Sequence, residues 1–79
     1  MQRRSITRYT MRGKGGRINK FGITSNPARR EGENRRAGND KTMRIEGPKV
    51  TKQSALNWER GKIESYQNRN GRRPPGNKV

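Results

Sequence analysis

The chain has 79 residues, of which 21 are Lys or Arg and 6 are Asp or Glu, giving a formal net charge of +15. Only 23% of the residues are apolar, so the length allows one small domain with a thin core. Cysteine and histidine are absent, which excludes disulfides, zinc fingers and histidine-based catalysis. A charge this high is typical of proteins that bind polyanions, and nucleic acid is the leading candidate.

Two strands joined by a glycine-rich turn are predicted in the first third of the chain. Residues 4–12 (RSITRYTMR) and 17–24 (RINKFGIT) are rich in β-branched and aromatic side chains. The sequence GKGG between them favours a turn, so the pair is predicted to form a hairpin. Alternation along the second strand places Phe21 and Ile23 on the core face and Lys20 on the opposite face.

A helix is predicted from about residue 27 to 37. The sequence SNP at 25–27 provides a polar capping residue followed by proline at the first helical position. Arg29 and Arg30 lie in the first turn, where the helix dipole disfavours cations unless an anion such as a phosphate binds there. Adjacent arginines are also ordinary in a chain this basic, so the pair alone does not establish an anion site.

A third strand over 42–46 (TMRIE) and a second helix, starting near Thr51 or Ser54 and ending near residue 68, complete the series. The order strand, strand, helix, strand, helix predicts an α+β fold in which helices flank a small three-stranded sheet. Residues 1–79 are predicted to form a single domain, with 71–79 as an extended C-terminal tail.

Glu59 is the most informative single side chain. It follows Ala55 by four residues and precedes Ile63 by four, so its carboxylate falls in the apolar stripe of the second helix. A carboxylate in such a stripe needs an ionic partner, a metal ion or a catalytic role. A structural salt bridge explains the position as well as a functional site does, and nothing local decides between them.

Tyr9 and Lys20 lie on adjacent strands of the predicted hairpin. A hairpin can bring such residues side by side, which places a phenol and an ammonium on one surface of the sheet. The simpler interpretation is that Tyr9 is half-buried packing and Lys20 a solvated charge. Asn77, in the sequence PPGNK, is by itself only a residue of the tail.

Taken together, these features resemble the GIY-YIG endonuclease family. The family's first motif corresponds to residues 7–9 (TRY), where only Tyr9 is kept, and its second motif corresponds to 20–22 (KFG). Lys20 stands in place of the tyrosine of the second motif. The best-matched stretch is FGITSNPARR at 21–30, and the resemblance extends over nearly the whole chain.

The resemblance implies metal-dependent hydrolysis of phosphodiester bonds, in DNA more than in RNA. It assigns catalytic roles to Tyr9, Lys20, Arg30, Glu59 and Asn77, with Glu59 also holding Mg²⁺ or Mn²⁺. Tyr9, assisted by Lys20, is the implied general base for an attacking water, and Arg30 neutralises charge on the phosphoryl group. Other cations are expected to grip the flanking nucleic-acid backbone: Arg8, Arg12, Lys14, Arg17, Arg29, Arg35 and Arg36.

A non-catalytic nucleic-acid-binding protein, associated with a ribosome or a genome, would have the same composition and remains the alternative. The joint register of the site residues favours the nuclease. Double-stranded DNA is the expected partner, and an acidic immunity or inhibitor protein is a further one if the chain is a toxin; a phage or mobile-element origin is an equal alternative. The sequence has no apolar run long enough to span a membrane. We expect a protein that acts in the cytoplasm, either made there or delivered as part of a larger secreted protein. A monomer is the simplest assembly for a protein with one metal site.

Overall fold

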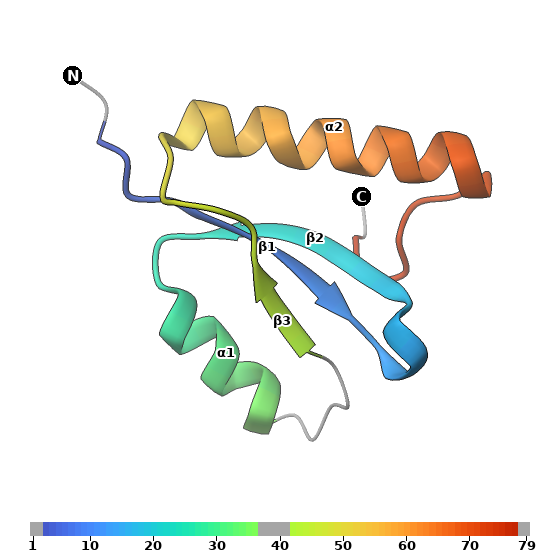
Figure 1. Cartoon of the computed structure of the whole chain (residues 1–79), viewed down its shortest axis with the longest axis horizontal. Coiled ribbons are helices and arrows are strands. Elements are labelled where there is room, and N and C mark those ends of the chain that lie inside the picture. The colour runs from blue at the N-terminus through green and yellow to red at the C-terminus, as the bar shows by residue number, and fades with distance from the viewer. Residues whose placement is uncertain (1–2, 37–41, 78–79) are drawn as a thin grey trace.

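The computed structural model describes residues 3–36 and 42–77 (Figure 1). Within these ranges the elements are β1 (Thr7–Arg12), the short 3-10 helix η1 (Lys14–Gly16), β2 (Ile18–Thr24), α1 (Pro27–Arg36), β3 (Thr42–Ile45) and α2 (Lys52–Asn70). The strands form an antiparallel sheet in the order β2-β1-β3. The α+β class and the predicted order of strands and helices are thus confirmed.

The hairpin of β1 and β2 is shorter at its start than the sequence predicts. Residues before Thr7 are not part of the strand, although Ile6 forms an isolated bridge with Val50. The connecting turn depends on Gly15 and Gly16, whose φ angles of 82° and 79° are readily adopted only by glycine. β3 likewise ends at Ile45, one residue earlier than expected.

The two faces of the sheet carry different residues, as the pairing register shows. Tyr9 lies opposite Gly22, and Thr10 lies opposite Phe21, so each pair shares one face because directly opposed side chains point the same way. The Phe21 ring packs edge-on against Trp58 of α2, with ring centroids 6.0 Å apart. We call the face with Phe21 the helix face and the face with Tyr9 the tyrosine face.

α2 is the long helix that packs across the sheet, whereas α1 lies on the other side of the sheet in Figure 1. The start of α2 is fixed by Thr51, whose side-chain oxygen accepts a hydrogen bond from the Ser54 N–H at 3.2 Å. α2 ends at Asn70, two residues beyond the predicted end near 68, and Gly71 in the left-handed conformation at φ 72° closes it. Among the described residues, no helix combines the length and the hydropathy needed to cross a bilayer.

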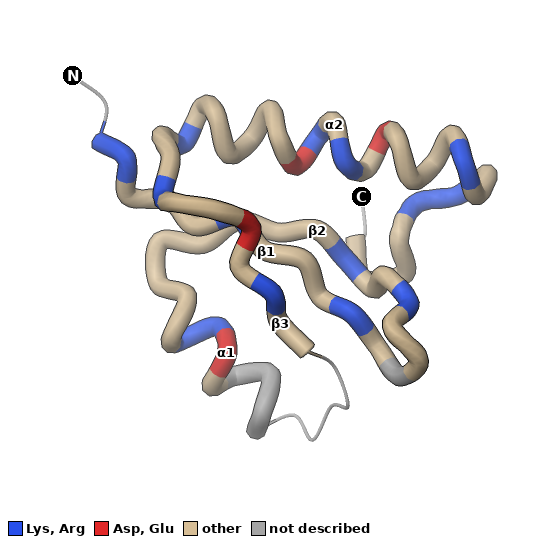
Figure 2. Tube along the Cα trace, in the orientation of Figure 1, with Lys and Arg blue, Asp and Glu red and all other residues tan. Residues whose placement is uncertain are grey.

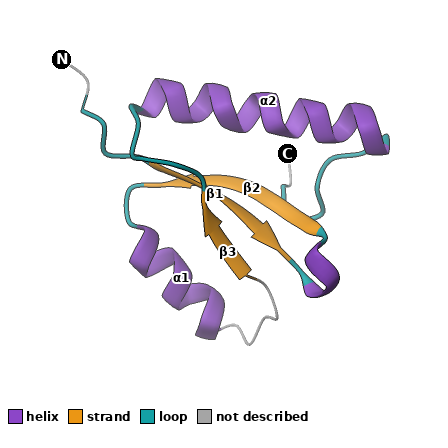
Figure 3. Ribbon diagram, in the orientation of Figure 1, coloured by secondary structure: helices purple, strands orange, loops and turns teal. Residues whose placement is uncertain are grey.

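The segment after α2 is not the extended tail that the sequence predicts. It turns back toward the sheet (Figure 3), and Pro74 is fully buried. The Gly76 N–H donates to the Asn19 carbonyl at 2.7 Å, and the Asn77 N–H donates to the Pro74 carbonyl at 3.0 Å. The prediction was wrong because backbone groups at the outer edge of β2 pair with this segment.

Candidate active site and nucleic-acid interface

Tyr9 and Lys20 meet on the tyrosine face, as the alternation of β2 predicts. The Lys20 Nζ lies 5.8 Å from the centroid of the Tyr9 ring, within the range of a cation–π interaction. Tyr9 exposes only 1% of its surface, so it packs in the core more deeply than the half-buried position that the simpler interpretation gave it.

Gly22 makes room for the tyrosine. A Cβ placed on Gly22 would collide with the Cζ and hydroxyl oxygen of Tyr9, so any larger residue at this position displaces the ring. The glycine of the KFG sequence therefore has a packing reason that the sequence alone did not reveal: it lets the Tyr9 ring lie directly over the neighbouring strand.

Glu59 projects from α2, and its residue is half-buried. Burial raises the pKa of the Glu59 carboxyl above its ordinary value of 4.5, and the nearby Lys20 ammonium offsets part of this rise. Among the described residues, no hydrogen bond or ion pair satisfies this carboxylate. The structural salt bridge that the sequence allowed is therefore not formed within the described part of the chain.

A single carboxylate also limits how a metal ion could bind. The described residues contain no group of three or more His, Cys, Asp or Glu side chains that could hold one. Mg²⁺ needs fewer protein ligands than this, because it is usually held by one or two carboxylates together with waters and substrate phosphates. Glu59, a half-buried carboxylate with no hydrogen bond or ion pair to the described residues, fits that type of site.

Asn77 lies at the outer edge of β2. Its amide nitrogen donates to the Phe21 carbonyl, and its amide oxygen accepts from the Phe21 N–H, both at 2.8 Å. Asn77 is thus next to Lys20 along the strand, but its polar atoms are occupied by the backbone. The arrangement makes Asn77 a residue that positions β2.

Arg30 is placed at the N-terminal turn of α1, where its backbone N–H donates to the Asn26 carbonyl at 3.2 Å. Asn26 caps the helix as predicted, since its side-chain oxygen accepts from the Arg29 N–H at 3.0 Å. A small pocket is lined by Arg30 together with Arg29 and the end of β2 at Thr24. Thr24 lies four residues beyond Lys20, or about 13 Å along the strand, so a substrate phosphate would have to lie between the two cations.

The other predicted nucleic-acid contacts differ in their surroundings. Arg17 and Arg29 are exposed. Arg8 is half-buried, with its guanidinium carbon 6.0 Å from the centre of the Trp58 ring, so it is less available for phosphates than Arg17 or Arg29. Arg12 donates to the Gly16 carbonyl at 2.9 Å. The side chains of Lys14, Arg35 and Arg36 lie outside the described residues.

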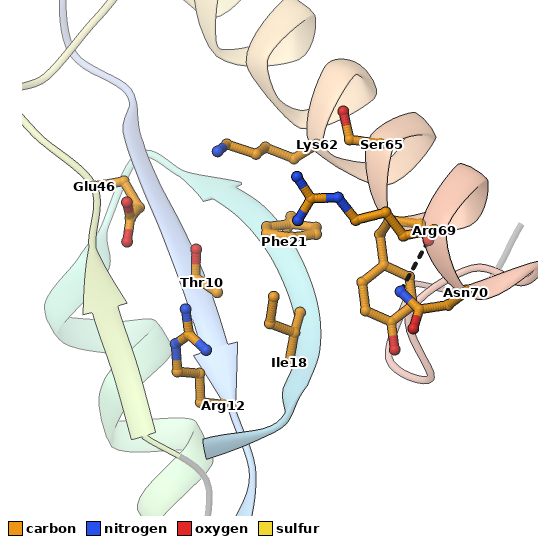
Figure 4. A pocket seen from close by; sticks show the side chains of 10 residues that line it. Thr10, Arg12, Ile18, Phe21, Glu46, Lys62, Ser65, Arg69 and Asn70 are labelled. Carbon is orange, nitrogen blue, oxygen red and sulfur yellow. Dashed lines mark hydrogen bonds between the residues drawn. The ribbon is translucent and has the colours of Figure 1, made fainter.

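An open pocket of about 330 Å³ lies on the helix face, between the sheet and the C-terminal half of α2 (Figure 4). We call it the helix-face groove. Lys62 and Arg69 of α2 lie along one side, and Arg12 lies on the sheet side. The sequence does not distinguish Lys62 and Arg69 as binding residues, because among 21 basic residues their spacing is not distinctive.

Comparison of the chain with protein-family models, with curated proteins and with solved structures gave no match. The resemblance to GIY-YIG endonucleases therefore depends on the residues and the arrangement described above. Lys20 lies close to Tyr9 and influences Glu59, and Asn77 holds the adjacent residue of β2. Arg30 lies on α1, beyond the far end of β2.

Proposed function

We propose that this protein is a metal-dependent endonuclease of the GIY-YIG type that hydrolyses phosphodiester bonds of nucleic acid, with double-stranded DNA as its substrate. The observation that carries the proposal is the position of Lys20, whose ammonium lies over the Tyr9 ring and also lowers the pKa of Glu59. Tyr9 and Lys20 share the tyrosine face of the sheet, and Glu59 of α2 is close enough to Lys20 for the ammonium to affect its pKa. Together they offer a phenol, an ammonium and a carboxylate, which are the acid–base groups that the proposed hydrolysis needs.

Tyr9 is the proposed general base. Its ring is buried over Gly22, which holds its hydroxyl in one position. The Lys20 ammonium lies 5.8 Å from the centre of the Tyr9 ring. We propose that Lys20 assists Tyr9 in accepting the proton of the attacking water.

Glu59 is the proposed ligand for Mg²⁺ or Mn²⁺. Such a cation supplies Lewis-acid stabilisation of charge on the phosphate and the leaving oxygen. Glu59 would bind it with an oxygen that no hydrogen bond or ion pair occupies within the described residues. Divalent charge also relieves the cost of ionising a carboxylate whose pKa burial raises.

Arg30 is proposed to bind a non-bridging oxygen pair of the scissile phosphate, because a planar guanidinium suits two such oxygens. The remaining cations supply affinity for the backbone without reading sequence. Lys and Arg occur on all three strands and both helices (Figure 2), so a duplex would meet positive charge from several directions. The simplest assembly is a monomer acting in the cytoplasm. An acidic inhibitor protein would bind the same positively charged surface as the nucleic acid.

The alternative is a protein that binds nucleic acid and does not cut it. The charge of +15 supports both functions equally. The deep burial of Tyr9 favours the alternative, because a buried ring in a small core has a structural purpose of its own. Glu59 makes no hydrogen bond or ion pair with the described residues, which favours the nuclease, since a carboxylate is a poor choice for a surface that only binds phosphates.

Incubation with supercoiled plasmid and Mg²⁺ or Mn²⁺ tests the proposal, with EDTA as the metal-free control. Glu59→Gln removes the proposed ligand, and Glu64→Gln removes the same charge from an exposed position of α2. We expect nicking by wild type and Glu64→Gln, and none by Glu59→Gln or Tyr9→Phe. Gel shifts in EDTA report binding separately. If the wild-type protein shifts the plasmid on the gel but leaves it uncut in both Mg²⁺ and Mn²⁺, the protein binds nucleic acid without cutting it.

A further inference from the structure

The helix-face groove lies on the face of the sheet opposite Tyr9 and Lys20. Its floor contains Phe21, and the ring of Tyr66 stands at 73° to the Phe21 ring with the centroids 6.5 Å apart. Thr10 and Ser65 add hydroxyl groups from the sheet and from α2 (Figure 4). The groove is therefore a second concave surface, separate from the proposed catalytic residues.

Its cations are not neutralised within the described part of the chain. Lys62 and Arg69 extend from α2 toward the sheet (Figure 4), and no ion pair or hydrogen bond of the described residues engages either head group. The single acidic residue that lines the groove is Glu46, which pairs with Arg44 at 3.5 Å. The groove thus keeps positive charge available for a ligand.

The cations are spaced for an extended anion rather than for one small ion. Lys62 and Arg69 are separated by two helical turns, or about 10.5 Å along the axis, on one side of α2. Arg12 faces them from β1, although its guanidinium also donates to the Gly16 carbonyl. A chain of phosphates running along the groove would meet all three.

The walls favour one strand over a duplex. α2 bounds one side of the opening and the sheet bounds the other (Figure 4), so a ligand must enter between them. A single strand can follow such a channel and place a base against the half-buried Tyr66 ring, because aromatic side chains are general stacking platforms for bases. A duplex cannot pass between α2 and the sheet, which are in contact through Trp58 and Phe21, so it would touch only the rim of the groove.

We propose that the helix-face groove binds single-stranded nucleic acid, with Lys62, Arg69 and Arg12 contacting phosphates and Tyr66 stacking on a base. This site is additional to the proposed nuclease centre and does not require that centre to be active. It gives the protein a surface for an unpaired strand on the side of the sheet away from Tyr9.

Fluorescence anisotropy with a labelled single-stranded DNA oligonucleotide in EDTA tests the site. The key variant is Lys62→Gln/Arg69→Gln. The matched control, Lys52→Gln/Arg60→Gln, removes two exposed cations of α2 that do not line the groove. We expect the groove variant to weaken binding more than the control and to reduce the salt slope by about 1.4, since each phosphate contact of a single strand contributes about 0.7.

Further variants and a duplex oligonucleotide distinguish a specific loss of single-strand binding from a general loss of charge or of folding. Lys62→Arg/Arg69→Lys should retain single-strand affinity, and circular dichroism verifies that each variant is folded. Binding of a matched duplex should fall by a similar amount in the groove and control variants. Equal losses of single-strand binding in both double variants would overturn the site, as would an equal loss for single strand and duplex in the groove variant. The measurement is made in EDTA and does not depend on cleavage, so a protein that proves inactive as a nuclease still gives an interpretable result.

Discussion

Asn77 holds both backbone groups of Phe21, with its amide nitrogen donating to the carbonyl and its amide oxygen accepting from the N–H, each at 2.8 Å. An asparagine side chain thus takes the place of a neighbouring strand at the outer edge of β2. The contact joins residues 56 positions apart in sequence. It fixes the strand directly beside Lys20, so we assign Asn77 a positioning role in the proposed site.

Replacing Asn77 with alanine should lower both stability and activity. Two partly buried hydrogen bonds are lost, which we expect to cost about 1–3 kcal/mol in the free energy of unfolding. Urea denaturation measures this loss, and Asn68→Ala, at an exposed position of α2, is the control. Plasmid nicking should fall as well, because β2 no longer holds Lys20 in place. An Asn77→Ala protein as stable as wild type would show that the edge contact contributes nothing.

Replacing Gly22 with alanine should destabilise the protein through the Tyr9 ring. The added methyl would collide with Tyr9, and such overpacking usually costs about 1–3 kcal/mol. Gly61→Ala is the matched control, because a Cβ there meets no atom within 4 Å among the described residues and alanine is the better helix former by about 1 kcal/mol. The two substitutions should therefore move the urea midpoint in opposite directions. A shift of the same sign for both would contradict the packing role of Gly22.

The sequence was sufficient to predict the order of the elements and the placement of Lys20 and Phe21 on opposite faces of the sheet. Both follow from short-range patterns: alternation along β2, the Asn26 cap of α1 and the glycine-rich turn. The same alternation brings Lys20 and Tyr9 onto one face, because hairpin pairing preserves it. This part of the candidate site was therefore predictable from local rules.

Other parts depend on contacts between distant segments, which local patterns do not reveal. The return of the C-terminal segment to β2 depends on Gly76 meeting Asn19, a contact between residues far apart in the chain. The complete burial of Tyr9 depends on the space that Gly22 leaves on the neighbouring strand. Whether Glu59 forms a salt bridge with the described residues depends on where the neighbouring cations lie, so helix periodicity alone could not decide between a salt bridge and a functional carboxylate.

The raised pKa of Glu59 should make its ionisation destabilising. The native state holds the Glu59 proton to higher pH than the unfolded chain does, so the free energy of unfolding decreases as the pH rises from about 4.5 through the native pKa. Glu59→Gln should therefore be more stable than wild type above this window, and the difference should vanish below it. Urea unfolding across pH 4–8 measures the effect, with Glu64→Gln reporting the general effect of removing one negative charge. A Glu59→Gln protein that is less stable than wild type at neutral pH would contradict the prediction that ionised Glu59 destabilises the native state.

Replacing Lys20 with methionine should shift the pH dependence of cleavage. The Lys20 ammonium lowers the pKa of Glu59 against the larger effect of burial, so its removal raises that pKa further. If ionised Glu59 holds the metal, the acidic limb of the rate against pH should move to higher pH in Lys20→Met and stay near its wild-type position in Lys20→Arg. The methionine variant also loses the contact with the Tyr9 ring, so its rate on the plateau should fall too. Initial nicking rates at saturating Mg²⁺ across pH 5–9 separate the two effects, and an unmoved acidic limb in Lys20→Met would show that Glu59 does not control the reaction.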